Sequence, residues 1–240
     1  MPPKRLRKKT NDNEAIFLFI AFWASVIIEC IALYKKEYSY YAYSRIWVVP
    51  VLLVRLFRSQ VYKKVNIYIW LSFLFALSAD ITTIFGNYTI SYIGLSLFTA
   101  SYLSIGCFFH QLKTNHNKSH LVFIFATVIL LIVNILWLYA PELHHQVFYL
   151  QVIVHSLVLA YLLYSGLILN KKLSARITSL FLIVNLILIL TNMIYGLDIL
   201  YFHRNYAIVD SIVGLGNGVY LFLFTRSVIR YIKMNINSIG

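Results

Sequence analysis

Hydrophobic residues along this chain gather in long runs that short polar or basic segments separate. Several runs reach about 20 residues, the length that an α-helix needs to cross a hydrocarbon core of ~30 Å. Alternation with period two is absent from the runs, so the pattern predicts membrane-spanning helices rather than a β-barrel. The eight predicted helices have the approximate bounds 15–34, 44–57, 66–86, 89–110, 121–140, 146–169, 177–201 and 208–230.

The predicted domain organisation is one all-α membrane bundle between two polar ends. The eight-helix transmembrane domain covers residues 15–231, a basic tail covers 1–14, and a short tail covers 232–240. No small-residue cleavage site follows the first run, so the basic start is predicted to be an uncleaved tail rather than part of a signal peptide. The run at 44–57 is the shortest and contains Pro50, which a membrane helix tolerates with a kink.

Composition supports a bilayer environment. Hydrophobic residues make up 60% of the 240 residues, charged residues only 12%, and the mean hydropathy is +0.76. A soluble domain of this size could not bury that much apolar surface. Cys30 and Cys107 both lie in apolar runs, where they are expected to act as small hydrophobic residues. The spacing of Cys and His predicts no metal site, and we expect no cofactor.

The net charge of +13 is explained by topology rather than by nucleic acid, because the basic residues lie in short segments between hydrophobic runs. With the N-terminal tail in the cytoplasm, 17 of the 21 basic residues fall in cytoplasmic segments. The outer loops then hold only four, namely Lys35, Lys36, Arg45 and Arg204. This bias predicts eight spans with both termini in the cytoplasm. A multi-pass protein of a bacterial inner (plasma) membrane is the inferred setting, and an internal eukaryotic membrane would have the same signature.

Acidic residues within the predicted spans are the first functional candidates. Asp80 lies in the third hydrophobic run, where a charged Asp near the bilayer centre costs roughly 2.5–3.5 kcal/mol on insertion scales. Asp198 lies in the seventh run, and the predicted topology places both aspartates in the outer half of the bilayer. Such residues usually have a partner or a function.

Other buried polar residues have structural alternatives. Asp210 stands near the start of the eighth helix and is expected to cap it, whereas Glu29 could form an interhelical hydrogen bond. His155 could be a satisfied core histidine, and Asn192 could join neighbouring helices by a hydrogen bond. Gly214, Gly216 and Gly218 could mark a break in the eighth helix or sites of close packing.

Two carboxylates in one low-dielectric cavity favour sharing a proton, since both cannot ionise cheaply. The pair then offers an acid and a base together, which suits hydrolysis of an acid-labile bond. Proton coupling in a small-molecule transporter would use the same pair equally well.

Short motifs around both aspartates resemble the YhhN/TMEM86 family of lysoplasmalogenase-like integral membrane proteins. The first block reads Leu77-Ser78-Ala79-Asp80, followed by Gly94-Leu95, Phe98 and Phe109. The second reads Gly196-Leu197-Asp198-Ile199-Leu200, followed by Phe202-His203-Arg204. The chain departs from the family at Ala79, where Gly is common, at Leu197, where Ser is common, and at Tyr102, where a family His falls. The aromatic-Ala-Gln pattern of the last helix is not evident at 220–225.

The resemblance implies hydrolysis of the vinyl-ether bond of a lysoplasmalogen, with a lysophospholipid substrate drawn from the bilayer. Asp80 and Asp198 would be the catalytic pair, with Asp198 taken as the acid and Asp80 as the base, an order that the sequence leaves open. Tyr102, His155 and Asn192 would orient water or the head group, and His203 and Arg204 would meet a phosphate at the outer surface. Glu29 and Asp210 are further candidates for binding or orienting the substrate. A proton-coupled transporter and a member that keeps the fold without the chemistry remain the alternatives.

Overall fold

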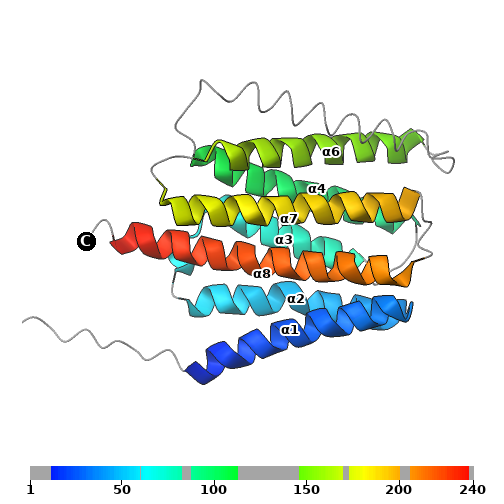
Figure 1. Ribbon diagram of the computed structural model, residues 1–240, viewed down its shortest axis with the longest axis horizontal. Helices are drawn as coiled ribbons and strands as arrows, with labels where there is room; N and C mark the ends of the chain where they lie inside the picture. The colour runs from blue at the N-terminus through cyan, green and yellow to red at the C-terminus, as the bar shows by residue number, and fades with distance from the viewer. Residues whose placement is uncertain are drawn as a thin grey trace, which may run out of the picture.

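The computed structural model describes residues 12–59, 61–82, 88–112, 146–169, 173–200 and 206–237, and these ranges are helical with no β-strand element. The helices are α1 (Asp12–Tyr34), α2 (Tyr38–Arg58), the short 3-10 helix η1 (Tyr62–Lys64), α3 (Ile67–Thr82), α4 (Tyr88–Gln111), α6 (Gln146–Leu167), α7 (Ala175–Leu200) and α8 (Ala207–Asn237). Figure 1 shows the α-helices lying roughly side by side along one long axis. The predicted all-α fold is confirmed for the described ranges.

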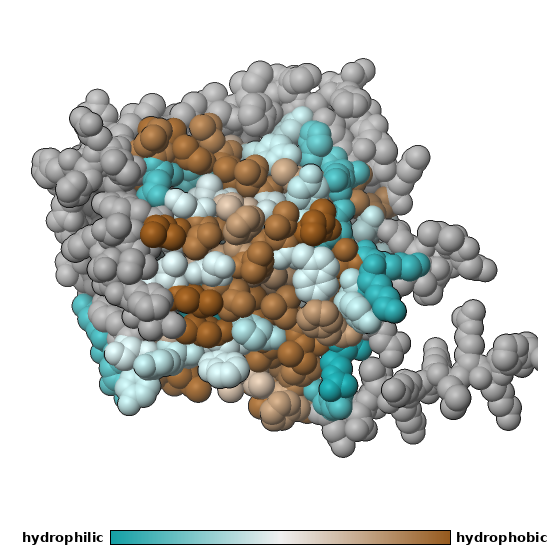
Figure 2. Space-filling view, turned by 180° about the vertical axis from the view of Figure 1, so that it is seen from behind, coloured by the Kyte–Doolittle hydropathy of each residue, from teal (hydrophilic) through white to brown (hydrophobic). Residues whose placement is uncertain are grey.

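Five of the described helices are long and apolar enough to cross a membrane, as expected for a multi-pass membrane protein. These segments are Glu14–Tyr34, Ile93–Gln111, Leu150–Leu167, Ala175–Leu197 and Ala207–Met234. A shorter apolar helix, Ile67–Thr82, accompanies them. Many large hydrophobic side chains of these helices are exposed, and Figure 2 shows them as a brown area across one face with hydrophilic residues toward its edges. Such a surface suits contact with lipid chains rather than with water.

The helix bounds differ from the predicted runs at several ends. α2 begins at Tyr38, six residues before the predicted start at 44, and it continues through Pro50. α1 begins at Asp12 and α8 extends to Asn237, so both run beyond the predicted spans. Hydrophobicity marks the part of a helix that is apolar, whereas the backbone hydrogen bonds continue into polar flanking residues. The predicted fifth helix, 121–140, lies outside the described residues.

Neighbouring helices form a closed ring in the order α1, α2, α3, α4, α6, α7, α8, with α8 returning to α1. Most neighbours are antiparallel, as expected for helices joined by short connections. α4 and α6 differ, because Ser96 contacts Gln151, Thr99 contacts His155, and Gly106 contacts Tyr161. Positions therefore advance in the same direction along both helices, and α4 and α6 are parallel.

Glycines let α8 approach its neighbours closely. A Cβ atom on Gly218 would come within 2.7 Å of Val26 of α1, and one on Gly214 would come within 2.9 Å of Leu33 of the same helix. Gly216 faces α7 at Thr191. α8 is one unbroken helix, so these glycines serve close packing rather than a break.

Candidate functional site

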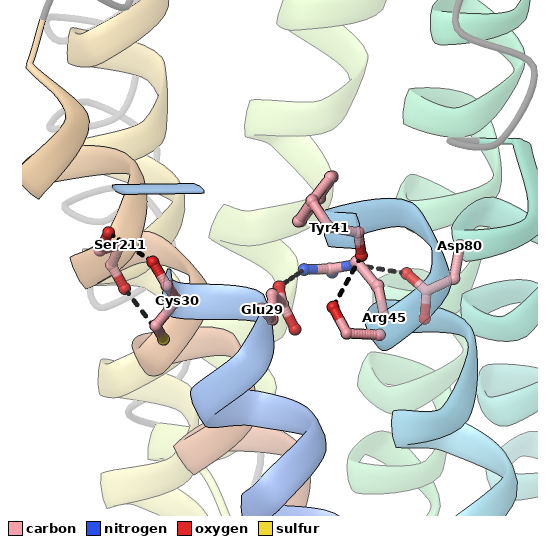
Figure 3. A network of polar contacts seen from close by, with 7 residues as sticks. Glu29, Cys30, Tyr41, Arg45, Asp80 and Ser211 are labelled. Atoms are coloured by element: carbon pink, nitrogen blue, oxygen red, sulfur yellow. Dashed lines mark hydrogen bonds and ion pairs between the residues drawn. The ribbon is translucent and has the colours of Figure 1, made fainter. Parts of the chain in front are cut away.

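A buried ionic network joins the first three helices. Arg45 of α2 donates from Nη1 to Oε1 of Glu29 in α1 and from Nε to Oδ1 of Asp80 in α3, both at 2.7 Å. The three residues are only 8%, 2% and 1% exposed, respectively. Figure 3 shows the guanidinium of Arg45 lying between the two carboxylates. One cation therefore holds two acids of different helices together in the interior.

The short connection between α1 and α2 places Glu29 opposite Arg45. α1 ends at Tyr34, Lys36 follows it at φ 58°, and the backbone N–H of Glu37 donates to the carbonyl oxygen of Ala32. α2 then starts at once and runs antiparallel to α1. Glu29 lies in the last two turns of α1 and Arg45 about two turns into α2, so the two side chains meet at the same level. Asp80, in the last turn of α3, reaches this level from the other side.

Aromatic rings surround the guanidinium. The Cζ atom of Arg45 lies 5.5 Å from the ring centroid of Phe98 and 5.9 Å from that of Tyr41. Both distances fit cation–π contacts, which strengthen when the groups are removed from water. Phe98 also stacks on Tyr102, with 6.3 Å between the ring centroids. Phe98 thus connects the ionic network to a second polar group in the interior.

This second group links α4, α6 and α7. Nδ1 of His155 lies 2.8 Å from Oγ1 of Thr99, and Nε2 of His155 lies 3.2 Å from Oδ1 of Asn192. Asn192 donates in turn to the carbonyl oxygen of Leu188, and the ring of Tyr102 lies 5.6 Å from that of His155. With the proton on Nε2, His155 donates to Oδ1 of Asn192, and its Nδ1 can accept from Thr99. The single hydroxyl proton of Thr99 also has the carbonyl oxygen of Leu95 within reach, at 2.7 Å, so the two acceptors compete for it.

The structure brings together five of the residues predicted from the sequence, in two adjacent groups. Asp80 and Glu29 belong to the ionic network, and Tyr102, His155 and Asn192 belong to the second group. The hydrogen bonds of His155 and Asn192 agree with their structural alternatives as well as with an orienting role.

The remaining predicted residues are Asp198, His203, Arg204 and Asp210. Asp198 lies in the last turn of α7, but its side chain is outside the described residues, as are His203 and Arg204. Asp210 lies within the first turn of α8 rather than before it, is buried, and its Oδ2 has no hydrogen-bond partner among the described residues. It therefore does not occupy the N-cap position that a capping residue takes.

Arg45 is the functional candidate that the sequence prediction missed. The predicted second helix began at 44, and Arg45 was counted among the basic residues of an outer loop. That assignment is wrong, because α2 begins at Tyr38 and buries Arg45. A signal was available: two acids in neighbouring apolar helices require a cation, and Arg45 is followed directly by the apolar stretch 46–54.

The arrangement can hold and exchange a proton. With all three groups ionised, Glu29, Arg45 and Asp80 carry one net negative charge, and one proton on either carboxylate makes the network neutral. Among the described residues, no group of three or more His, Cys, Asp or Glu side chains could hold a metal ion. Two carboxylates that share one cation offer acid–base chemistry together.

Comparison with known proteins adds no further assignment. No family model, curated protein or solved structure matches the chain. What the described residues define is an all-helical chain with the features of a multi-pass membrane protein and a buried carboxylate–guanidinium network. The resemblance described above rests on its motif residues.

Proposed function

We propose that this protein is an integral membrane hydrolase of the lysoplasmalogenase type, which cleaves the vinyl-ether bond of a lysoplasmalogen to a fatty aldehyde and a glycerophospho-base. The observation that carries the proposal is the buried network of Glu29, Arg45 and Asp80. It places a second carboxylate and a cation at the aspartate that the motif resemblance marks as catalytic.

Asp80 is assigned the role of base. A carboxyl donor delivers a proton to the vinyl carbon, and the resulting oxocarbenium ion is stabilised by the ionised carboxylate of Asp80. Water then adds to the cation and loses a proton to Asp80. The hemiacetal then collapses to the aldehyde and the free hydroxyl of the glycerophospho-base, as its hydroxyl proton moves to the ether oxygen. Transfer of the proton from Asp80 back to the donor closes the cycle, which consumes one water molecule.

Two carboxyls are candidates for the proton donor. Asp198 is the second aspartate of the motif resemblance, whereas Glu29 is the carboxyl that shares the cation with Asp80. Arg45 is a positioning residue, because its planar guanidinium fixes both carboxylates at once. Tyr102, His155 and Asn192 lie beside the network and are assigned the orientation of water or the head group.

The proposed topology has eight spans with both termini in the cytoplasm. Parallel packing of α4 and α6 supports it, because two neighbouring parallel helices need a connection that returns along the bundle. The predicted fifth helix at 121–140 would supply this return.

Proton-coupled transport is the second candidate function. The same observation favours it, since protonation of Glu29 or Asp80 would change the net charge of the buried network, which is how proton-coupled carriers use membrane acids. A purified protein that releases no aldehyde but carries protons across vesicle membranes, with flux lost in Asp80→Asn, would favour the carrier.

Release of fatty aldehyde from lysoplasmenylethanolamine by purified protein tests the hydrolase. We expect Asp80→Asn to lower the rate by at least ~100-fold, since a positioned acid or base contributes about 10²–10⁴-fold. Glu29→Gln and Asp198→Asn separate the two donor candidates, because only the donor's replacement should cause a loss of this size. Wild-type protein that is folded but inactive on every vinyl-ether lipid would contradict the proposal.

A further inference from the structure

Four arginines gather at the end of the bundle opposite to the ionic network. They come from three helices: Arg55 from α2, Arg176 from α7, and Arg226 and Arg230 from α8. Arg226 lies close enough to repel both Arg55 and Arg230, and Arg176 acts on Arg230 in the same way. α8 packs directly against α2 and α7, which brings together the parts of these helices that carry the four arginines. We refer to these four residues as the arginine cluster.

The arrangement of the arginine cluster follows from the spacing of its members on α8. Phe222, Arg226 and Arg230 are spaced four residues apart and therefore lie along one face of the helix. Arg55 reaches this face from α2, with its Cζ atom 4.6 Å from the ring centroid of Phe222. The aromatic ring holds the guanidinium of Arg55 half-buried beside Arg226.

No described acidic side chain neutralises the cluster. The ion pairs among described residues are those of Arg45 and the pair between Arg58 and Glu14 at 3.5 Å. Four neighbouring cations repel one another, and an anion between them would remove the repulsion. Arginine also suits phosphate in particular, because its planar fork can donate two parallel hydrogen bonds to phosphate oxygens.

We propose that the arginine cluster binds the phosphate of an anionic phospholipid in the leaflet at this end of the bundle. Exposed apolar side chains, Val54 and Phe57, lie close to Arg55 in the sequence of α2. A phosphate at the cluster would thus have apolar protein surface beside it for its acyl chains, which free phosphate would not use. α1 begins and α8 ends at this end (Figure 1), which the charge distribution predicts to face the cytoplasm.

Thermal unfolding in detergent with added phosphatidylglycerol tests this site. A ligand that binds the folded state raises the unfolding midpoint in a concentration-dependent way, so titration gives an apparent affinity. Basic residues near the membrane surface contribute about 1 kcal/mol each toward anionic lipid, or roughly fivefold in affinity. We expect Arg226→Gln and Arg230→Gln each to weaken the apparent affinity about fivefold, with little effect of phosphatidylcholine on any variant.

Arg58→Gln is the matched control, because it removes the same charge from the same end of the bundle at an exposed ion pair. We expect it to leave the phosphatidylglycerol affinity unchanged. Equal losses in Arg58→Gln and Arg226→Gln would show diffuse surface attraction and overturn the site. Inorganic phosphate that stabilises as strongly as the lipid would overturn the assignment to a phospholipid. Native mass spectrometry of bound lipids gives a second readout for any variant that unfolds early.

Discussion

At the scale of the residue, the protein depends on Arg45, which contacts two carboxylates in the interior. Removing three charges from water is costly, and each hydrogen bond at 2.7 Å offsets part of that cost only while all partners are present. The network is therefore more sensitive to loss of one member than to replacement of all three. Because of this asymmetry, variants that lack one member or all three members can distinguish a structural role of the network from a chemical one.

Arg45→Met should lower the free energy of unfolding by about 3–5 kcal/mol, because it leaves Glu29 and Asp80 buried without their cation. The midpoint of thermal unfolding in detergent, followed by circular dichroism, measures the effect. Arg58→Gln serves as the control and should change stability by less than about 1 kcal/mol, since its pair with Glu14 is exposed. Similar stability of Arg45→Met and wild type would mean that the network does not hold the helices together.

A neutral replacement of the whole network should restore most of that stability. The triple variant Glu29→Gln, Arg45→Met, Asp80→Asn leaves no buried charge at this place, and such replacements of ion pairs are often neutral or stabilising. Its unfolding midpoint should lie closer to that of the wild type than to that of Arg45→Met. A triple variant as unstable as Arg45→Met would show that the shape of the three side chains, rather than their charge, determines stability at these positions.

At the scale of the element, glycine and small-residue contacts set the distances between helices. α8 uses Gly214 and Gly218 toward α1, one turn apart, and Ser211 exchanges hydrogen bonds with Cys30 a turn earlier. In a bilayer, helices gain little from hydrophobic association, so close backbone approach and interhelical hydrogen bonds provide the attraction. The α1–α8 contact closes the ring of helices and is the one that should respond most to added bulk.

Gly218→Leu should destabilise the fold by about 1–3 kcal/mol, because its Cβ alone would come within 2.7 Å of Val26 and the packed interface must shift. Ala24→Leu on α1 adds an apolar side chain at an exposed position and should leave the unfolding midpoint nearly unchanged. Equal shifts in the two variants would indicate that the α1–α8 interface is loosely packed.

Sequence patterning predicted where the helices lie better than which side chains pair between them. Run length and hydrophobicity placed all seven described α-helices, since a bilayer requires apolar helical spans. The cost of burying charge singled out Glu29 and Asp80 correctly as residues in need of partners. Arg45 was missed because hydropathy ends an apolar run at a charge, whereas the helix continues when that charge is paired inside. Pairing across helices depends on rotation about each axis, which run length does not determine.

At the scale of the whole molecule, a closed ring of described helices carries an ionic network toward one end and an arginine cluster toward the other. Two features constrain how this ring can lie in a membrane. One is the parallel packing of α4 and α6, and the other is that α1 begins and α8 ends at the same end of the bundle. In the proposed topology, the outer half of the bilayer would hold Glu29 and Asp80, and the cytoplasmic surface would hold the arginine cluster.

Fusions to the C-terminus test this orientation. A green fluorescent protein fusion should fluoresce and an alkaline phosphatase fusion should be inactive, because the C-terminus is predicted to face the cytoplasm. The same fusions placed after residue 112 and before residue 146 should report opposite sides of the membrane, since α4 ends and α6 begins at opposite ends of the bundle. Reports from the same side at both places would contradict a span between α4 and α6.

The most direct test of the central claim is aldehyde release from lysoplasmenylethanolamine by the neutral triple variant Glu29→Gln, Arg45→Met, Asp80→Asn, compared with wild type at equal amounts of folded protein. We expect the wild type to release aldehyde and the folded variant to be slower by at least ~100-fold, because the acid–base groups are gone while the helices stay in place. A folded variant as active as the wild type would leave the network a structural role alone and rule out its part in the hydrolysis.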